Sequence, residues 1–306
     1  RAEYTKTIAH KGFHTMTART TKTSSEEPPA KRAKSSAGHA DRKGVVVLDY
    51  GSQYTQLITR RIRELSIYCV LVPGDVKKES IVELAPAAII LSGGPNSVHV
   101  EGAPKVFDGF WDYVKQNSIP VLGICYGMQL IVHQWGGQVE PADKREYGRM
   151  PIKTVSGSKL YGDNFVGFDT EHVWMSHGDE AKVLPKGFTC VAKSEEGAIV
   201  AIENPTENVY GLQYHPEVTH TENGTATLKR FLYDICNLSG NWSMEDVLKE
   251  QLEKIEAQVG PNGHAICALS GGVDSAVAAT LVNKVMGGRL HCCFVDNGFF
   301  RDKEGE

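Results

Sequence analysis

Short apolar runs, each closed by a turn and followed by a helical pattern, recur along the middle of this chain. Val45–Leu48 is one such run, and it ends at Asp49-Tyr50-Gly51-Ser52. Similar runs lie at residues 68–72, 88–91 and 121–124. Runs of this length between turn residues are typical of buried parallel strands. Strands that alternate with helices predict an α/β fold with a doubly wound, mostly parallel sheet.

The segments between these runs carry helical spacing. After the first run, Ile58, Ile62 and Leu65 share one helical face. A further helix is expected from Ala103 to Gln116, and from Met150 to Gln213 we expect short strands with little helix. Sheets of this kind place their chemistry at the carboxyl ends of strands, so functional motifs are expected there.

A cysteine between two glycines is the first such motif. Gly123-Ile124-Cys125-Tyr126-Gly127 has the form glycine, any residue, nucleophile, any residue, glycine. The glycines permit the sharp strand-to-helix turn that exposes a nucleophile. The N-terminus of the following helix favours a thiolate over a thiol. The alternative interpretation of Cys125 is a buried structural thiol.

His215-Pro216-Glu217 directly follows the apolar run at residues 210–214. His215 is therefore expected at the same sheet edge as Cys125, where an imidazole can act as base for the thiol. Glu217 can accept the second ring N–H and fix the tautomer. The alternative is an ordinary surface loop.

Two glycine-containing turns offer backbone N–H groups. Ser92-Gly93-Gly94-Pro95 follows another strand, and its amides are candidate donors to an oxyanion, together with the Tyr126 amide; a plain turn is the alternative. Ser270-Gly271-Gly272-Val273-Asp274-Ser275 joins the expected strand 265–269 to a helix expected from Ser275 onward. Its amides and hydroxyls favour an anion, although no Walker lysine follows. Asp296-Asn297-Gly298 closes the next strand and is expected near the same ligand.

Residues 122–129 and 215–217 together resemble the triad-type class I glutamine amidotransferases, which have a flavodoxin-like sheet. Residues 49–54, 92–96 and 173–179 resemble the GMP synthetase branch of that family. The resemblance covers Gly44 to about Asn237. It implies Cys125 as nucleophile, His215 as base and then acid, and Glu217 as the carboxylate that orients His215. It further implies Gly94 and Tyr126 as oxyanion donors, and glutamine binding by Gln129, Ser176, Gly178 and Asp179.

The Ser-Gly-Gly-Val-Asp-Ser loop resembles the pyrophosphate loop of N-type ATP pyrophosphatases. That resemblance implies ATP contacts at Ser270, Gly271, Gly272, Val273, Asp274, Ser275 and Ala276, with Asp274 facing Mg²⁺. In the GMP synthetase branch, ammonia from glutamine displaces AMP from adenylated XMP. The implied domains are a glutamine amidotransferase at 44–238 and a truncated ATP pyrophosphatase at 239–306. We expect a fragment that lacks the XMP site, from a full-length protein that is a homodimer.

Charge is distributed unevenly. Residues 1–43 hold ten Lys or Arg and four Asp or Glu, a net charge of +6. Because the whole chain has a net charge of −4, the remaining residues carry −10. We expect residues 1–43 to be a disordered basic tail; a nuclear-import signal at Pro28–Lys34 or a transit peptide stays open. An acidic remainder predicts no nucleic-acid partner. No apolar run nears the roughly 18 residues of a membrane span. Seven scattered cysteines predict a reducing compartment, the cytosol, and no metal site.

Two other functions remain open at this point. One is a cysteine hydrolase that acts on γ-glutamyl peptides, which would have no use for a pyrophosphate loop. The other is a nucleotide-responsive module whose hydrolytic site is inactive.

Overall fold

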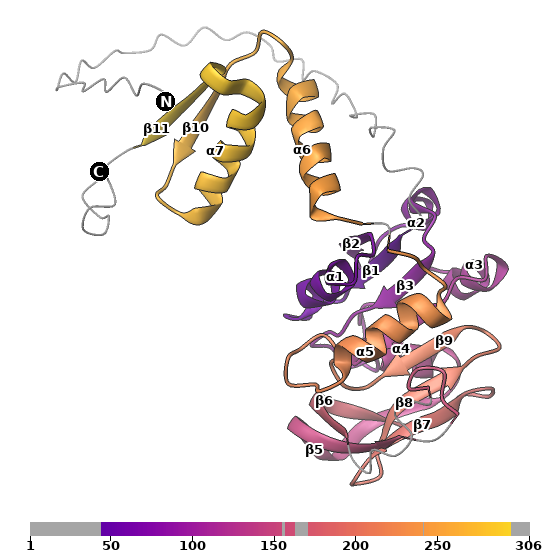
Figure 1. Ribbon diagram of the computed structural model, residues 1–306. Helices are drawn as coiled ribbons and strands as arrows, with labels where there is room; N and C mark the ends of the chain where they lie inside the picture. Colours follow the sequence, from indigo (N-terminus) through magenta and orange to yellow (C-terminus); the bar gives the residue numbers. More distant parts are fainter. Residues whose placement is uncertain (1–43, 155–156, 163–170, 241, 295–306) are drawn as a thin grey trace, which may run out of the picture. The chain divides into compact units, whose positions relative to one another are not determined.

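The computed structural model describes residues 44–154, 157–162, 171–240 and 242–294 (Figure 1). The predicted tail at 1–43 and the Asp296-Asn297-Gly298 motif lie outside the described residues. The described elements form two sheets, one of nine strands and one of two.

The nine-stranded sheet has the strand order β2-β1-β3-β4-β9-β8-β7-β5-β6. Neighbours from β2 to β9 in this order pair in parallel, and the remaining neighbours pair antiparallel. The predicted α/β class is confirmed, with the parallel part built from the runs identified in the sequence. The strands are β1 (Val45–Asp49), β2 (Cys69–Pro73), β3 (Ala88–Leu91), β4 (Val121–Ile124), β5 (Gln138–Thr154), β6 (Glu171–Val183), β7 (Thr189–Ser194), β8 (Ile199–Asn204) and β9 (Val209–Leu212).

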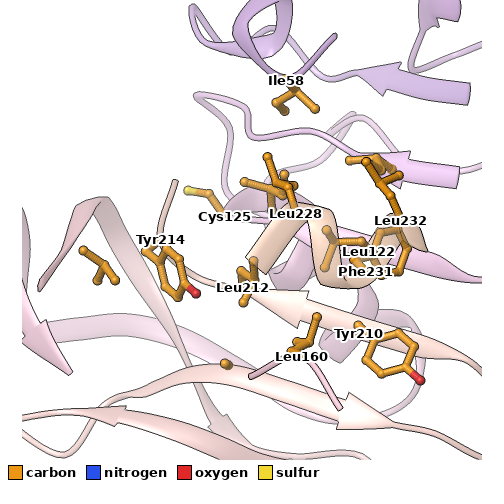
Figure 2. Packing of buried hydrophobic residues seen from close by; sticks show 14 of the residues in the cluster. Ile58, Leu122, Cys125, Leu160, Tyr210, Leu212, Tyr214, Leu228, Phe231 and Leu232 are labelled. Atoms are coloured by element: carbon orange, nitrogen blue, oxygen red, sulfur yellow. The ribbon is translucent and has the colours of Figure 1, made fainter. Parts of the chain in front are cut away.

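Helices cover both faces of the parallel strands, as a doubly wound sheet requires. The helices are α1 (Thr55–Glu64), α2 (Lys78–Leu84), α3 (Phe110–Gln116), α4 (Tyr126–Gln134) and α5 (Gly224–Lys229), which continues as a π-helical turn η2 (Arg230–Ile235). One core cluster joins α1, α5 and η2 to alternate strand residues, and the other joins α2, α3 and α4 to the intervening ones. Figure 2 shows the first cluster, in which Leu228 and Phe231 pack near Leu122 and Leu212. Cys125 belongs to the same cluster.

Two expectations about this sheet were wrong. The helix expected from Ala103 begins at Phe110, because Pro104 disfavours helical backbone at the residue before it and Gly109 adopts φ +80°. The strands between Met150 and Gln213 are not all short, since β6 has 13 residues and pairs with β5, which has 17. Side chains along β6 alternate between buried and half-buried, as in a strand with one covered face.

The second group of elements comprises α6 (Met244–Val259), β10 (Ala265–Leu269), α7 (Val273–Met286), a 3₁₀ turn η3 (Gly287–Arg289) and β11 (Leu290–Phe294). The Ser243 hydroxyl accepts the Asp246 amide N–H at 3.1 Å and so caps α6. Strands β10 and β11 pair in parallel. Helix α7 begins at Val273, two residues earlier than expected, because the backbone is extended only as far as Gly272. None of the helices in the described ranges is long and apolar enough to cross a membrane.

Candidate active site

The turn between β4 and α4 presents Cys125 in a strained backbone. Its φ is +51° and its ψ −105°, values that residues with a side chain rarely adopt. Two glycines make the turn possible by close packing. A Cβ at Gly127 would lie 2.3 Å from the Leu91 carbonyl oxygen, and one at Gly123 would lie 2.5 Å from the Gly127 carbonyl carbon. The turn therefore tolerates no side chain at either flanking position.

Strand pairing brings His215 to this turn. Ile124 of β4 and Leu212 of β9 are register partners, and the Cys125 amide donates to the Leu212 carbonyl at 2.7 Å. Beyond Leu212 the chain carries His215, whose imidazole interacts with the Cys125 thiol. The Nδ1 atom of His215 lies 2.8 Å from Oε1 of Glu217. Cysteine, imidazole and carboxylate thus meet at one sheet edge, as the sequence predicts, and all three are buried.

Electrostatics favour the charged form of this imidazole. Burial lowers the pKa of His215, but hydrogen bonds to Cys125 and Glu217 and the negative charge of Glu217 outweigh it, raising the pKa to about 10. An imidazolium beside the sulfur therefore persists through neutral pH. That arrangement can hold a thiolate and deliver a proton to a leaving group.

Several backbone contacts hold the His215 loop in place. The His215 amide donates to the Trp174 carbonyl of β6 at 3.0 Å, and the Thr221 hydroxyl donates to the His215 carbonyl at 2.6 Å. Nε of Arg61 donates to the Glu217 carbonyl at 3.0 Å. The Tyr54 ring meets the imidazole edge-on, with centroids 5.1 Å apart. The loop is thereby held by α1, by β6 and by the turns that contain Tyr54 and Thr221.

The predicted oxyanion donors lie on two segments that pack against each other. The Gly127 amide donates to the Ser92 carbonyl at 3.1 Å, which places the turn after β3 beside the start of α4. Tyr126 is the first residue of α4, where a backbone N–H has no acceptor within its own helix. A Cβ at Gly94 would lie 2.7 Å from the Tyr50 carbonyl oxygen, so this close approach also needs glycine. The Tyr126 side chain turns elsewhere and donates to the Pro104 carbonyl.

A pocket of about 540 Å³ opens over Cys125. Its wall contains seven of the predicted residues, namely Gly94, Cys125, Gln129, Ser176, Gly178, Asp179 and His215. Glu217 lies behind His215, outside the lining. Sequence reasoning assigned no role to several other lining residues, namely Gly51, Ser52, Gln53, Tyr54, Pro95, Asn96, Ser97, Tyr147 and His177. The turn after β1 could have been found, because it ends a parallel strand at the same edge; Tyr147 on β5 had no comparable signal.

Two side-chain amides connect the pocket wall to the sulfur. Nε2 of Gln129 donates to the Asp179 carbonyl at 2.8 Å and to Oε1 of Gln213 at 3.3 Å. Nε2 of Gln213 lies 3.7 Å from the Cys125 sulfur. The amide nitrogen of Gln129 is therefore committed to protein acceptors, which leaves its oxygen for a ligand. Gln213 was not identified from the sequence.

A buried pair lies behind the β6 segment of the wall. His177 Nε2 and Glu146 Oε2 are 3.3 Å apart, and the two residues are register partners on β6 and β5. The adjacent His177 imidazole lowers the pKa of Glu146 despite burial. Nδ1 of His177 lies 3.0 Å from the Asp179 carbonyl oxygen, so this pair supports the stretch from Ser176 to Asp179.

The second glycine-rich loop joins β10 to α7 and is exposed, with Ser275 half-buried. The hydroxyls of Ser270 and Ser275 are 3.1 Å apart, and the Ser270 amide donates to the Ser275 hydroxyl at 3.2 Å. Gly271 adopts φ +78°. Asp274 lies in the first turn of α7. The loop thus presents hydroxyls and the open amides of a helix N-terminus together, a donor set that suits a phosphate group.

Comparison with known proteins gives consistent matches. Residues 46–235 match the family model described as glutamine amidotransferase class-I. A glutamine-hydrolyzing GMP synthase of Carboxydothermus hydrogenoformans is 49% identical over 263 residues, covering 86% of this chain and 50% of that protein. The one of Brachyspira hyodysenteriae is 48% identical over 261 residues, covering 85% and 49%. The chain spans about half the length of these curated relatives. A crystal structure described as a GMP synthase subunit from Thermoplasma acidophilum superposes with a TM-score of 0.55 at 29% identity, covering 67% of this chain and 96% of that one.

Proposed function

The chain belongs to the class-I glutamine amidotransferase family, and from this membership we propose that it hydrolyses glutamine with Cys125, His215 and Glu217. The ammonia would serve the ATP-dependent amination of XMP to GMP in the whole protein. The observation that carries the proposal is the buried contact of thiol, imidazole and carboxylate at the ends of β4 and β9. The names of the curated relatives support the acceptor reaction.

The first half-reaction makes a thioester. The Cys125 thiolate attacks the side-chain carbonyl carbon of glutamine, and the electron pair of the C=O bond moves onto oxygen. Backbone N–H groups of Gly94 and Tyr126 stabilise that oxyanion. When the intermediate collapses, the C–N bond breaks and the imidazolium of His215 gives its proton to the departing nitrogen. Ammonia leaves, and a glutamyl thioester remains on Cys125.

The second half-reaction restores the enzyme. His215, now neutral, takes a proton from water, which attacks the thioester carbonyl. The C–S bond breaks, glutamate leaves, and the thiolate and imidazolium are regenerated. Glu217 keeps the Nδ1–H of His215 in place throughout, so that Nε2 faces the reacting atoms.

The pocket wall supplies groups for the rest of the glutamine molecule. We assign the amide oxygen of Gln129 and the Asp179 carboxylate to the α-ammonium group, since both are acceptors in the pocket lining. Ser176 and Gly178, on the same β6 segment, complete the contacts to the amino-acid head.

For the acceptor reaction we assign the loop between β10 and α7 to ATP. Ser270, Gly271, Gly272, Val273, Ser275 and Ala276 would hold phosphate oxygens, and Asp274 would face Mg²⁺. Bound ATP would supply an adenylyl group that activates the C2 oxygen of XMP. The residues of this chain contribute amide and hydroxyl donors, and they fit because Gly271 and Gly272 leave the loop backbone exposed. We further propose the cytosol as the compartment, supported by seven cysteines that are all free.

Ammonia release from glutamine tests the hydrolytic proposal. We expect the purified chain to release ammonia and Cys125→Ala to lose that activity. Cys190→Ala, which changes a half-buried thiol outside the pocket, should retain it. A Cys125→Ala protein with full activity would sink the proposal, and faster turnover of γ-glutamyl peptides than of glutamine would redirect it.

Calorimetric binding of pyrophosphate tests the second loop. Ser275→Ala should weaken binding, because it removes a hydroxyl from the cradle. Thr280→Ala, on the exposed face of the same helix, is the matched control and should bind as the parent does. Equal binding by all three proteins would count against the ATP assignment.

A further inference from the structure

The Cys125 sulfur has a polar neighbour that the mechanism above does not use. Gln213 directly follows β9, and its backbone N–H donates to the Val200 carbonyl at 2.8 Å, so the residue is fixed on the sheet. Its side chain is fully buried. Nε2 lies 3.7 Å from the sulfur, a distance at which sulfur accepts a hydrogen bond. Because burying an unpaired amide is costly, both ends of this carboxamide need partners.

The partner at the other end fixes which way the carboxamide points. Oε1 of Gln213 accepts a hydrogen bond from Nε2 of Gln129 at 3.3 Å. If the amide were reversed, its oxygen would face the sulfur and its nitrogen would face another donor. The oxygen would repel a thiolate, and the nitrogen would face a second N–H donor. The N–H end of the carboxamide therefore faces Cys125.

The other hydrogen-bond partner of the sulfur favours the protonated thiol over the thiolate. The Ser176 carbonyl oxygen lies 3.7 Å from the sulfur and can accept only from a protonated thiol. Once the S–H bond breaks and its proton passes to His215, that carbonyl offers nothing to the anion. The Gln213 N–H does the reverse, since it bonds an anion more strongly than a neutral thiol.

We propose that Gln213 is a further residue of the reactive centre, whose carboxamide N–H stabilises the Cys125 thiolate and whose orientation is set by Gln129. This inference rests on the proposed function insofar as Cys125 is the nucleophile. It also connects the two ends of the pocket, because Gln129 is bonded to the Asp179 carbonyl. A ligand that moves Gln129 therefore changes the hydrogen bond at the sulfur.

Alkylation of Cys125 by iodoacetamide, followed against pH by peptide mass spectrometry, tests the inference without requiring turnover. Gln213→Met removes the donor at similar length, and Gln213→Asn withdraws it by one methylene. We expect the alkylation midpoint to rise by about one pH unit, so that alkylation is up to about tenfold slower at pH values below the midpoint of the parent. The titratable groups around the sulfur stay unchanged in both variants: Tyr54, Tyr147, His177, Asp179 and His215 in the lining, with Glu146 and Glu217 behind them.

Gln134→Met is the control, because it removes a carboxamide from the far end of α4, where Gln134 bonds Trp111. Its midpoint should match that of the parent. Thermal denaturation establishes which Gln213 variants fold, and an unshifted midpoint in a folded variant overturns the inference. The parent chain could release no ammonia while the Gln213 variants still show a higher Cys125 midpoint than the parent. That result would discard the proposed function and keep the role of Gln213.

Discussion

Replacing Glu217 by glutamine should separate the charge of this carboxylate from its shape. In the parent, Nδ1 of His215 lies 2.8 Å from Oε1 of Glu217. The substitution keeps an oxygen that can accept the Nδ1–H but removes the negative charge. A hydrogen bond to a charged group contributes about 1.5–3 kcal/mol, and one pKa unit corresponds to about 1.36 kcal/mol. The pKa of His215, raised to about 10 in the parent, should therefore fall by about one to two units.

The assay is ammonia release, measured as kcat/KM from pH 6 to pH 10.5. Loss of the imidazolium proton sets the alkaline limb, which belongs to the coupled thiol and imidazole. We expect this limb to move down in Glu217→Gln, so that the variant loses about two- to tenfold more activity at pH 9 than at pH 7. An alkaline limb that stays in place while the rate falls would refute the reasoning, because Glu217 would then act by shape alone.

Stability gives an independent check on the same charge. The raised pKa of His215 stabilises the fold fully below about pH 6.5, and this contribution is lost as pH rises through about 10. The deficit of Glu217→Gln should therefore be largest below about pH 8 and vanish above about pH 10. Glu203→Gln is the matched control: Glu203 is a buried carboxylate that accepts the Leu160 amide at 2.7 Å, away from the pocket. It should cost stability without moving the alkaline limb.

Two further substitutions test packing and burial. Gly127→Ala should lower the free energy of unfolding by about 1–3 kcal/mol and reduce glutaminase activity, because its Cβ would lie 2.3 Å from the Leu91 carbonyl oxygen. Thermal denaturation measures the loss of stability. The control is Gly288→Ala, which should change stability little because the space around Gly288 is open. Burial raises the pKa of Glu171 to about 7, so its ionised form destabilises the fold as pH rises from about 4.5 to 7. Glu171→Gln should therefore stabilise the protein by about 1–2 kcal/mol at pH 8 and hardly at pH 5; equal changes in Tm at both pH values would contradict this account.

The parallel half of the sheet was predictable because β1, β3, β4 and β9 are buried on both faces. Strands β3 and β4 have the bounds that their apolar runs predict. Cys125 and His215 follow the carboxyl ends of β4 and β9, which pair in parallel. Their placement at one edge therefore followed from sheet geometry. The positions of these two side chains were therefore accessible from local patterns.

The pocket wall was not accessible in the same way. Strands β5 and β6 pair over a long antiparallel stretch with two register shifts, and their half-buried faces mix polar and apolar residues. No local signal states that Tyr147 and His177 reach the space above Cys125. Gln213 was missed for a related reason, because a glutamine beside a histidine motif gives no sign in the sequence that its side chain is buried.

Strands β4 and β9 are neighbours in the sheet, yet the chain makes an excursion through four other strands between them. In the proposed reaction, the sulfur and the imidazole therefore come from two adjacent strand ends, whereas the groups that we assign to glutamine binding, Ser176 to Asp179, come from the outermost strand. Insertions or deletions inside the excursion can reshape what the pocket admits while the reacting atoms keep their alignment. A scaffold of this kind lets substrate selection and partner contacts diverge without rebuilding the bond-breaking machinery.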